Sequence, residues 1–206
     1  MVPSLFYRKN NFLSSLSDKK KKLREEYRRR RDAFHSQLDI ATRSLAFRRP
    51  PTPLAKRIEQ SEVIALYSAI GSEAPTASLA EYLTDIGKIL AFPVVVGNAP
   101  LEFRKVDHLD LLQAGFRSIS EPGADCPTVT PDLIIAPMTA FDRSMHRLGQ
   151  GGGHYDRTFE KYPDAIRIGF AWSVQETEAV PVQPHDIPLH MIVTESELIE
   201  RVEMTP

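Results

Sequence analysis

A glycine-rich stretch in the last third of the chain carries the residue types best suited to chemistry. Residues 147–157 have the sequence RLGQGGGHYDR, in which four of five consecutive positions are glycine. Glycine leaves the backbone free to adopt positive φ and lets another group approach it closely. Exposed N–H groups that lead into a helix form a concave anion site. The stretch therefore predicts a phosphate-binding loop, and a flexible surface loop is the alternative.

Two common nucleotide motifs do not fit this stretch. A Walker A loop ends in Gly-Lys-Ser or Gly-Lys-Thr, and no such tripeptide follows the glycines. A dinucleotide fingerprint, Gly-x-Gly-x-x-Gly, that began at Gly149 and Gly151 would need a third glycine at position 154, which is histidine. The strict forms of both motifs are excluded.

The composition limits the class of protein. A length of 206 residues suits one domain, and 42% hydrophobic residues can fill a core. A formal net charge of -1 argues against a surface devoted to nucleic acid. The single cysteine, Cys126, rules out an intramolecular disulfide and fits a reducing compartment, so we expect a cytoplasmic protein. No apolar run approaches the roughly 20 residues that a membrane span needs, so no membrane contact is expected.

Alternating strands and helices are expected to position the loop. Residues 62–67 form an apolar, β-branched strand, residues 76–86 a helix ended by Gly87, and residues 88–96 the next strand. This order implies a parallel pair with a right-handed crossover, and ligands of such sheets gather at the carboxyl ends of the strands. Glu73 follows the first strand, although a solvated or capping glutamate is the simpler interpretation of that residue alone.

The glycine loop follows the most apolar of the predicted strands. Residues 132–137 contain Leu-Ile-Ile-Ala, which should be buried on both faces of a sheet, and residues 155–162 form the helix after the loop. These elements predict an α/β fold, with three αβα layers and a mainly parallel central sheet. The other expected elements are strands at 101–106 and 165–172 and short helices at 53–60, 109–114 and 198–202.

The N-terminal part of the chain divides into an extension and a basic helix. Residues 1–17 contain no acidic residue and four serines, a composition compatible with an organelle transit segment, but the stretch is short, which favours a flexible extension. Residues 18–206 then form a single domain. Ser17-Asp18 can cap a helix that runs to about Gln37.

One face of that helix is strongly basic. Lys20, Arg24, Arg28 and Arg31 are spaced so that they share a face. A solvated charged face is the simplest interpretation of most of the nine basic residues between positions 19 and 31. Acidic residues among them disfavour nucleic-acid binding, so no nucleic-acid partner is expected.

Several motifs, taken together, resemble 5-formyltetrahydrofolate cyclo-ligase, also called methenyltetrahydrofolate synthetase. The pattern Arg-Leu-Gly-x-Gly-x-Gly-x-Tyr-Asp-Arg follows an apolar strand and the pair Phe141-Asp142. Gly115-Phe116, Ser120-Glu121-Pro122 and the segment from Gln175 to Glu195 follow the order of the family. The resemblance implies an enzyme that uses ATP and magnesium to convert 5-formyltetrahydrofolate to 5,10-methenyltetrahydrofolate. The formyl oxygen is phosphorylated and N10 closes the ring, with release of ADP and phosphate; we expect a monomer.

The resemblance also implies that the N-terminal helix packs near the nucleotide site, and it implies roles for individual residues. Arg147 would be the catalytic charge stabiliser, and we expect its side chain to be exposed. Asp156 and Asp186 would bind magnesium, although Asp156 could instead cap a helix and Asp186 could hold a turn. The residues implied for ATP are Lys20, Arg24, Arg147, Leu148, Gly149, Gln150, Gly151, Gly152, Gly153, His154 and Tyr155, with the register of Lys20 open among four lysines. Those implied for the folate are Ser68, Glu73, Gln150, Gly151, Gly152, Gly153 and His154.

Three residues depart from the family pattern. His154 stands where a tyrosine that lines the folate pocket is usual, and it brings a titratable ring there. Met145 stands where glycine is common, so the turn before Arg147 is expected to differ, and His190 stands where aspartate is common. These departures leave open a second hypothesis, a paralogue that binds folate or nucleotide with an altered substrate or without turnover.

Overall fold

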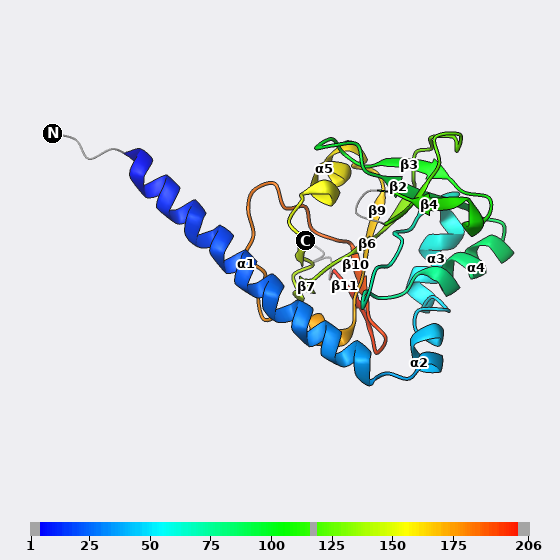
Figure 1. The fold of residues 1–206 in the computed structure, drawn as a ribbon, viewed down its shortest axis with the longest axis horizontal. Helices are drawn as coiled ribbons and strands as arrows, with labels where there is room; N and C mark the ends of the chain where they lie inside the picture. The colour runs from blue at the N-terminus through cyan, green and yellow to red at the C-terminus, as the bar shows by residue number, and fades with distance from the viewer. Residues whose placement is uncertain (1–4, 116–118, 202–206) are drawn as a thin grey trace, which may run out of the picture.

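A seven-stranded sheet forms the centre of the protein in the computed structural model, which describes residues 5–115 and 119–201 (Figure 1). Its strands are β1 Val63–Ala65, β2 Ile89–Val94, β3 Glu102–Lys105, β6 Leu133–Pro137, β9 Ile166–Phe170, β10 Met191–Val193 and β11 Leu198–Glu200. They lie in the order β11-β10-β9-β6-β1-β2-β3. Neighbours from β10 to β2 are parallel, whereas β11 and β3 are antiparallel at the two edges. The predicted mainly parallel sheet is confirmed, with the strand before the glycine loop at its centre.

Helices cover both faces of this sheet. Alternate residues of a strand point to opposite faces, so Ile64 and Ile135 join one apolar cluster while Ala65 and Ile134 join another. The first cluster includes side chains of α3 and α4, and the second includes Phe159 of α5. The three αβα layers are therefore present. The helices are α1 Leu5–Gln37, α2 Ile40–Leu45, α3 Thr52–Gln60, α4 Ala77–Asp85 and α5 His154–Lys161, with 3-10 turns η1 Leu109–Leu111 and η3 Ser173–Gln175.

Helix α1 crosses the edge of the sheet where the parallel strands end. The Tyr27 hydroxyl donates a hydrogen bond to the carbonyl of Glu176, just after η3 (3.0 Å). Phe34 packs on Trp172, which follows β9, with 5.6 Å between the ring centroids. The first half of the helix projects away from the sheet (Figure 1). The second half therefore lies over the carboxyl edge, where the site is expected.

The start of α1 differs from the prediction. The helix begins at Leu5, and Ser17 and Asp18 lie inside it rather than capping it. Residues 5–16 contain neither glycine nor proline, so nothing in that stretch interrupts a helix once it has formed. Residues 1–4 lie outside the described part of the chain. The flexibility of residues 1–17 and the single domain over residues 18–206 stay predictions.

Two short helices expected from the sequence are partly or wholly strands: the segment at 109–114 is helical only in the 3-10 turn Leu109–Leu111. After η1, residues Leu112–Ala114 form β4, which pairs antiparallel with β5 (Ser120–Pro122). Residues Leu198–Glu200 form β11, which pairs antiparallel with β10, and Val202 lies outside the described residues. Short apolar runs do not distinguish a helix from a strand by periodicity, and in both places a neighbouring strand supplies the pairing. Phe116, part of a turn that the family resemblance suggested, is also outside the described residues.

Candidate functional site

The glycine loop connects a small hairpin to α5. The hairpin consists of β7 (Ala140–Phe141) and β8 (Arg147–Leu148), which follow the central strand β6. Gly151 has φ +106° and Gly153 has φ +65°, backbone angles that side chains rarely tolerate. Gly153 is the N-cap of α5, so the loop leads directly into a helix N-terminus, as predicted. Such a loop presents backbone N–H groups and the positive end of a helix dipole.

The basic face of α1 lies on this loop. The Arg24 Nε donates to the carbonyl of Gly149 (2.8 Å), and Arg28 Nη2 donates to Gln150 Oε1 (2.5 Å). A Cβ added to Gly151 would lie 3.4 Å from the guanidinium carbon of Arg24, so the loop and the arginine are in direct contact. Burial against the loop lowers the pKa of Arg24, and Arg28 adds to that shift. Lys20 and Arg24 are thus placed where positive charge could reach a nucleotide phosphate.

The two aspartates implied for magnesium lie near each other, and each already contacts a cation. Asp186 Oδ2 accepts from Lys20 Nζ at 2.5 Å and from the backbone N–H of Gln183 at 2.7 Å. Asp156 Oδ1 accepts from Arg147 Nη2 at 2.7 Å. The backbone N–H of Ile187, the residue after Asp186, makes a long hydrogen bond of 3.5 Å to the same Oδ1. Asp156 lies in the first turn of α5, and the N-cap residue of this helix is Gly153.

The donor set fits a magnesium ion that brings ligands of its own. Asp156 Oδ2 and Asp186 Oδ1 accept no hydrogen bond from the described residues, so each carboxylate keeps one oxygen for a cation. Within residues 5–115 and 119–201, no group of three or more His, Cys, Asp or Glu side chains could hold a metal by itself. Magnesium commonly uses one or two carboxylates and completes its shell with phosphates and waters.

Arg147 is buried, and the expectation of an exposed side chain is wrong. Its guanidinium lies 4.4 Å from the centre of the Phe159 ring and donates to the carbonyl of Ile187 (2.7 Å) as well as to Asp156. Only 8% of the residue is exposed. Burial lowers the pKa of Arg147, and the Asp156 carboxylate opposes that shift. Pairing of β8 with β7 directs this side chain into the core, which proximity to glycines in the sequence does not reveal.

Glu73 lies under the glycine loop, next to α1. It is 6% exposed, and its Oε2 accepts from the backbone N–H of Ile70 at 3.2 Å. Its Oε1 accepts from Gln150 Nε2 at 3.2 Å and lies 3.7 Å from Arg31 Nη1. Burial raises the pKa of the Glu73 carboxyl group, and the hydrogen bond from Ile70 and the charge of Arg31 oppose the rise. The structure therefore brings together Glu73, the loop and the basic helix, three parts far apart in the sequence.

Two other residues implied for the folate have well-defined local contacts. Ser68 follows β1, and its hydroxyl donates to the carbonyl of Ser120 at 2.6 Å. His154 is the first residue of α5, and its Nδ1 lies 3.3 Å from Arg157 Nη2. A Cβ on Gly152 would be only 2.7 Å from the His154 ring, so the ring packs against the loop. Their roles toward a ligand stay predictions.

The remaining two departures from the family pattern have local structural consequences. Met145 has φ +70°, the conformation that favours glycine, and only 1% of the residue is exposed. The turn therefore keeps the backbone angle that a glycine would adopt, and core burial of the side chain offsets its strain. His190 Nδ1 accepts from the backbone N–H of Arg167 at 2.9 Å, which joins the amino ends of β10 and β9 rather than the glycine loop.

Arg28 and Arg31 also contact the site, although the sequence assigned neither of them a role toward a ligand. Their spacing from Lys20 and Arg24 placed them on the same helix face, and that spacing is the signal for their position. The sequence could not show their contacts, because the partner of each is distant in the chain. Gln150 lies 122 residues after Arg28, and Glu73 lies 42 residues after Arg31.

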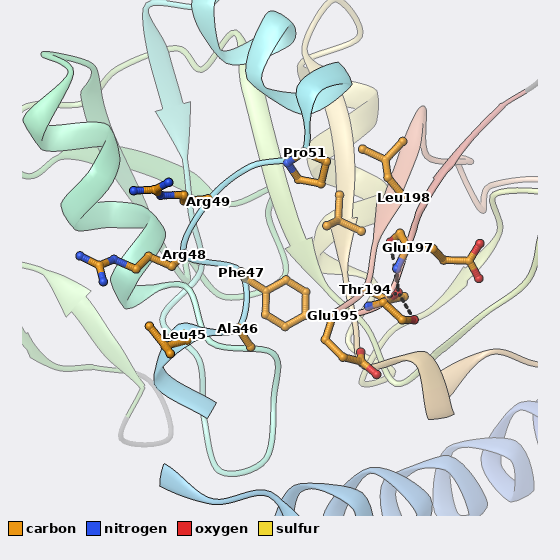
Figure 2. A pocket seen from close by; sticks show the side chains of 12 residues that line it. Leu45, Ala46, Phe47, Arg48, Arg49, Pro51, Thr194, Glu195, Glu197 and Leu198 are labelled. Atoms are coloured by element: carbon orange, nitrogen blue, oxygen red, sulfur yellow. Dashed lines mark hydrogen bonds between the residues drawn. The ribbon is translucent and has the colours of Figure 1, made fainter. Parts of the chain in front are cut away.

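A separate cavity of about 680 Å³ lies between the segment that follows α2 and the turn joining β10 to β11 (Figure 2). The Phe47 ring lines it, whereas the side chains of Arg48 and Arg49 point away from it (Figure 2). Thr194 and Glu197 bond to each other on the far wall. None of the glycine-loop residues lines this cavity, so it is not the predicted site.

Comparisons with known proteins agree with the resemblance. The model of the 5-formyltetrahydrofolate cyclo-ligase family matches residues 16–195. The 5-formyltetrahydrofolate cyclo-ligase of Escherichia coli (strain K12) is 34% identical over 170 residues, which cover 78% of this chain and 88% of that protein. The enzyme of the same name from Haemophilus influenzae is 32% identical over 143 residues, 65% of this chain and 76% of that protein. The NMR structure of Aquifex aeolicus 5,10-methenyltetrahydrofolate synthetase has a TM-score of 0.70 and 26% identity, covering 91% of this chain and 95% of that one.

Among the helices of the described residues, none combines the length and the apolar character needed to cross a bilayer.

Proposed function

The chain belongs to the 5-formyltetrahydrofolate cyclo-ligase family, and we propose that it catalyses the ATP- and magnesium-dependent conversion of 5-formyltetrahydrofolate to 5,10-methenyltetrahydrofolate. The observation that carries the proposal is the meeting of three parts at one edge of the sheet. The glycine loop, the basic face of α1 and the buried Glu73 are connected by the Gln150 side chain. A nucleotide and a folate could thus bind side by side, as phosphoryl transfer between them requires.

The chemistry proceeds in two stages. The formyl oxygen on N5 attacks the γ-phosphorus of ATP, and ADP leaves. N10 then attacks the activated formyl carbon, and phosphate leaves as the five-membered ring closes. Phosphoryl transfer depends mainly on positioning and on charge neutralisation, so the protein needs donors and cations more than a nucleophile.

The residues of this chain supply those groups. The backbone N–H groups of the glycine loop and the charges of Lys20 and Arg24 would bind the phosphates. Glu73 would orient the folate from the opposite side. Asp156 and Asp186 would hold magnesium, which supplies positive charge to the phosphate oxygens when bound. Arg147 would position Asp156 through its hydrogen bond, and its buried place beside Phe159 favours this role over direct contact with a phosphate.

A direct assay tests the proposal. The appearance of methenyltetrahydrofolate absorbance would be followed with 5-formyltetrahydrofolate, ATP and magnesium, and again with each component omitted. We expect product only in the complete mixture. A folded protein that gives no product under these conditions would contradict the proposed reaction.

A matched pair of variants tests the nucleotide site. Arg24→Met removes the cation that contacts Gly149 of the loop. Arg29→Met removes an exposed cation that, among the described residues, bonds only to the carbonyl of Glu25 in its own helix. We expect the KM for ATP to rise at least about tenfold in the first variant, the scale of one lost charged hydrogen bond, and to stay within about twofold in the second. Equal KM values in the two variants would show that α1 does not take part in ATP binding.

We further propose that the protein acts in the cytoplasm as a monomer without a nucleic-acid partner. Cell fractionation and size-exclusion chromatography with light scattering would check the first two statements, and salt-dependent retention on nucleic acid would contradict the third.

A further inference from the structure

Arg31 is the last basic residue on the face of α1 that covers the loop. Its Nε donates to the Ser72 hydroxyl at 2.9 Å, and that hydroxyl donates in turn to Asp32. The residue is only 7% exposed. The guanidinium is therefore fixed in one orientation, with Nη1 at 3.7 Å from Glu73 Oε1.

One donor of this guanidinium has no acceptor among the described residues. Arg31 Nη1 is buried and makes no hydrogen bond to any described residue, since 3.7 Å to the carboxylate is too long for one. A buried donor without an acceptor destabilises a fold, and native proteins avoid it unless the group has another use. Nη1 is therefore available to a ligand that binds next to Glu73.

The chemistry beside Glu73 indicates what kind of ligand fits. The carboxamide of Gln150 lies there, donating from Nε2 to Glu73 Oε1 (3.2 Å) and accepting at Oε1 from Arg28 (2.5 Å). This position can therefore bind a planar group that carries a hydrogen-bond donor next to a hydrogen-bond acceptor. A carboxylate next to a free arginine N–H matches that pattern, because one accepts and the other donates. The pterin ring of a folate has such an edge, an N–H beside a carbonyl.

We propose that Arg31 is a substrate-binding residue whose Nη1 donates a hydrogen bond to the pterin carbonyl oxygen while Glu73 accepts from the adjacent N–H. Gln150 gives up its place beside Glu73 when the folate binds. The proposal rests on the proposed function above, and it adds a specificity-determining residue on the helix that also contacts the nucleotide loop.

Kinetic constants of two methionine variants provide the first test. Arg31→Met removes the donor, and Arg29→Met removes a charge from the exposed side of the same turn of α1. We expect Arg31→Met to raise the KM for 5-formyltetrahydrofolate about tenfold to a hundredfold, with the KM for ATP within about twofold, and Arg29→Met to change neither. Arg31→Lys should not restore the KM, because an ammonium group cannot bond to Ser72 and to the ring in the geometry of a planar fork.

Binding of a substrate analogue separates direct contact from an effect through Glu73. In the 4-thio analogue of 5-formyltetrahydrofolate, sulfur replaces the carbonyl oxygen, so the acceptor that would face Arg31 is weaker while the N–H that would face Glu73 is kept. The parent protein should bind the carbonyl form about threefold to tenfold more tightly by calorimetry, and Arg31→Met should lose most of that preference. Weaker binding with an unchanged preference would mean that Arg31 only places Glu73, and would overturn the proposal.

The stability of each variant and the turnover of the parent protein are measured in the same series. If Arg31→Met does not fold, Ser72→Ala provides the test, because it releases the guanidinium without removing it; an unchanged KM and an unchanged preference in that variant would count against the proposal. Failure of the parent protein to turn over 5-formyltetrahydrofolate rejects the proposed function. If the parent turns over normally and the KM of Arg31→Met for 5-formyltetrahydrofolate is within about twofold of the parental KM, only the role of Arg31 is rejected and the proposed function stands.

Discussion

The hairpin before the glycine loop carries two arginines whose removal should affect stability to very different extents. Arg147 donates to Asp156 and to the carbonyl of Ile187, and its side chain is 4% exposed. Arg143, in the turn of the same hairpin, bonds to Glu176 and Glu197, but its side chain is 57% exposed. Each is replaced by alanine. If burial, rather than the presence of ion pairs, determines how much an arginine contributes to the free energy of unfolding, only Arg147→Ala should be strongly destabilised.

The expected effect of Arg147→Ala follows from its surroundings. Removing one partner of a buried ion pair costs about 3–5 kcal/mol, because the other charge is left unpaired. The Asp156 side chain is 22% exposed and can gain some water, which places the estimate at the lower end, about 3 kcal/mol. For a chain of this size, a loss of that order lowers the melting temperature by about 6–12 °C. An exposed pair contributes little, so Arg143→Ala should melt within about 2 °C of the parent.

Thermal unfolding followed by circular dichroism measures both variants. Magnesium titration of turnover, below the melting temperature, then shows whether Arg147 positions Asp156; we expect Arg147→Ala to require more metal and to lose about two orders of magnitude in turnover. Equal melting temperatures for the two variants would refute the argument from burial. A stable Arg147→Ala protein with parental kinetics would also remove Arg147 from the site.

Three further predictions concern residues of the site. Asp156→Asn should shift the magnesium requirement of turnover upward, because it removes an anionic ligand and keeps the shape; an overlay of the two titrations would leave Asp156 with a structural role only. Burial raises the pKa of the Glu73 carboxyl group above 4.5, so the protonated group stabilises the fold below that value, and this contribution is lost as the pH rises through the folded-state pKa. In urea unfolding, the stability of Glu73→Gln should therefore fall less than that of the parent as the pH rises above 4.5 toward neutrality, and parallel curves would contradict this. His154→Tyr should keep activity within about tenfold of the parent, since an aromatic surface is worth on the order of 1 kcal/mol, and loss of turnover in a folded variant would show a differently built pocket.

Residues close together in the sequence were sufficient to predict the glycine loop, the central strand and the basic helix face. The glycines predicted the loop and the start of α5, because only residues without a side chain tolerate angles such as φ +106° at Gly151. The apolar run at residues 133–136 predicted the central strand, because a strand buried on both faces must be apolar throughout. The charge spacing on α1 predicted its basic face. Each of these follows from residues near one another in the chain.

Other features were decided only by the tertiary structure. Strands β4 and β11 exist because a partner strand supplies their hydrogen bonds, and such pairing is not encoded in three residues. The burial of Arg147 depends on the pairing of β8 with β7, and its partner Asp156 lies beyond the whole glycine loop. The contact of Arg31 with Glu73 joins residues 42 positions apart. Which charges are paired, and which donor is left free for a ligand, depends on distances across the folded chain, and those arise only when α1 packs across the carboxyl edge of the sheet.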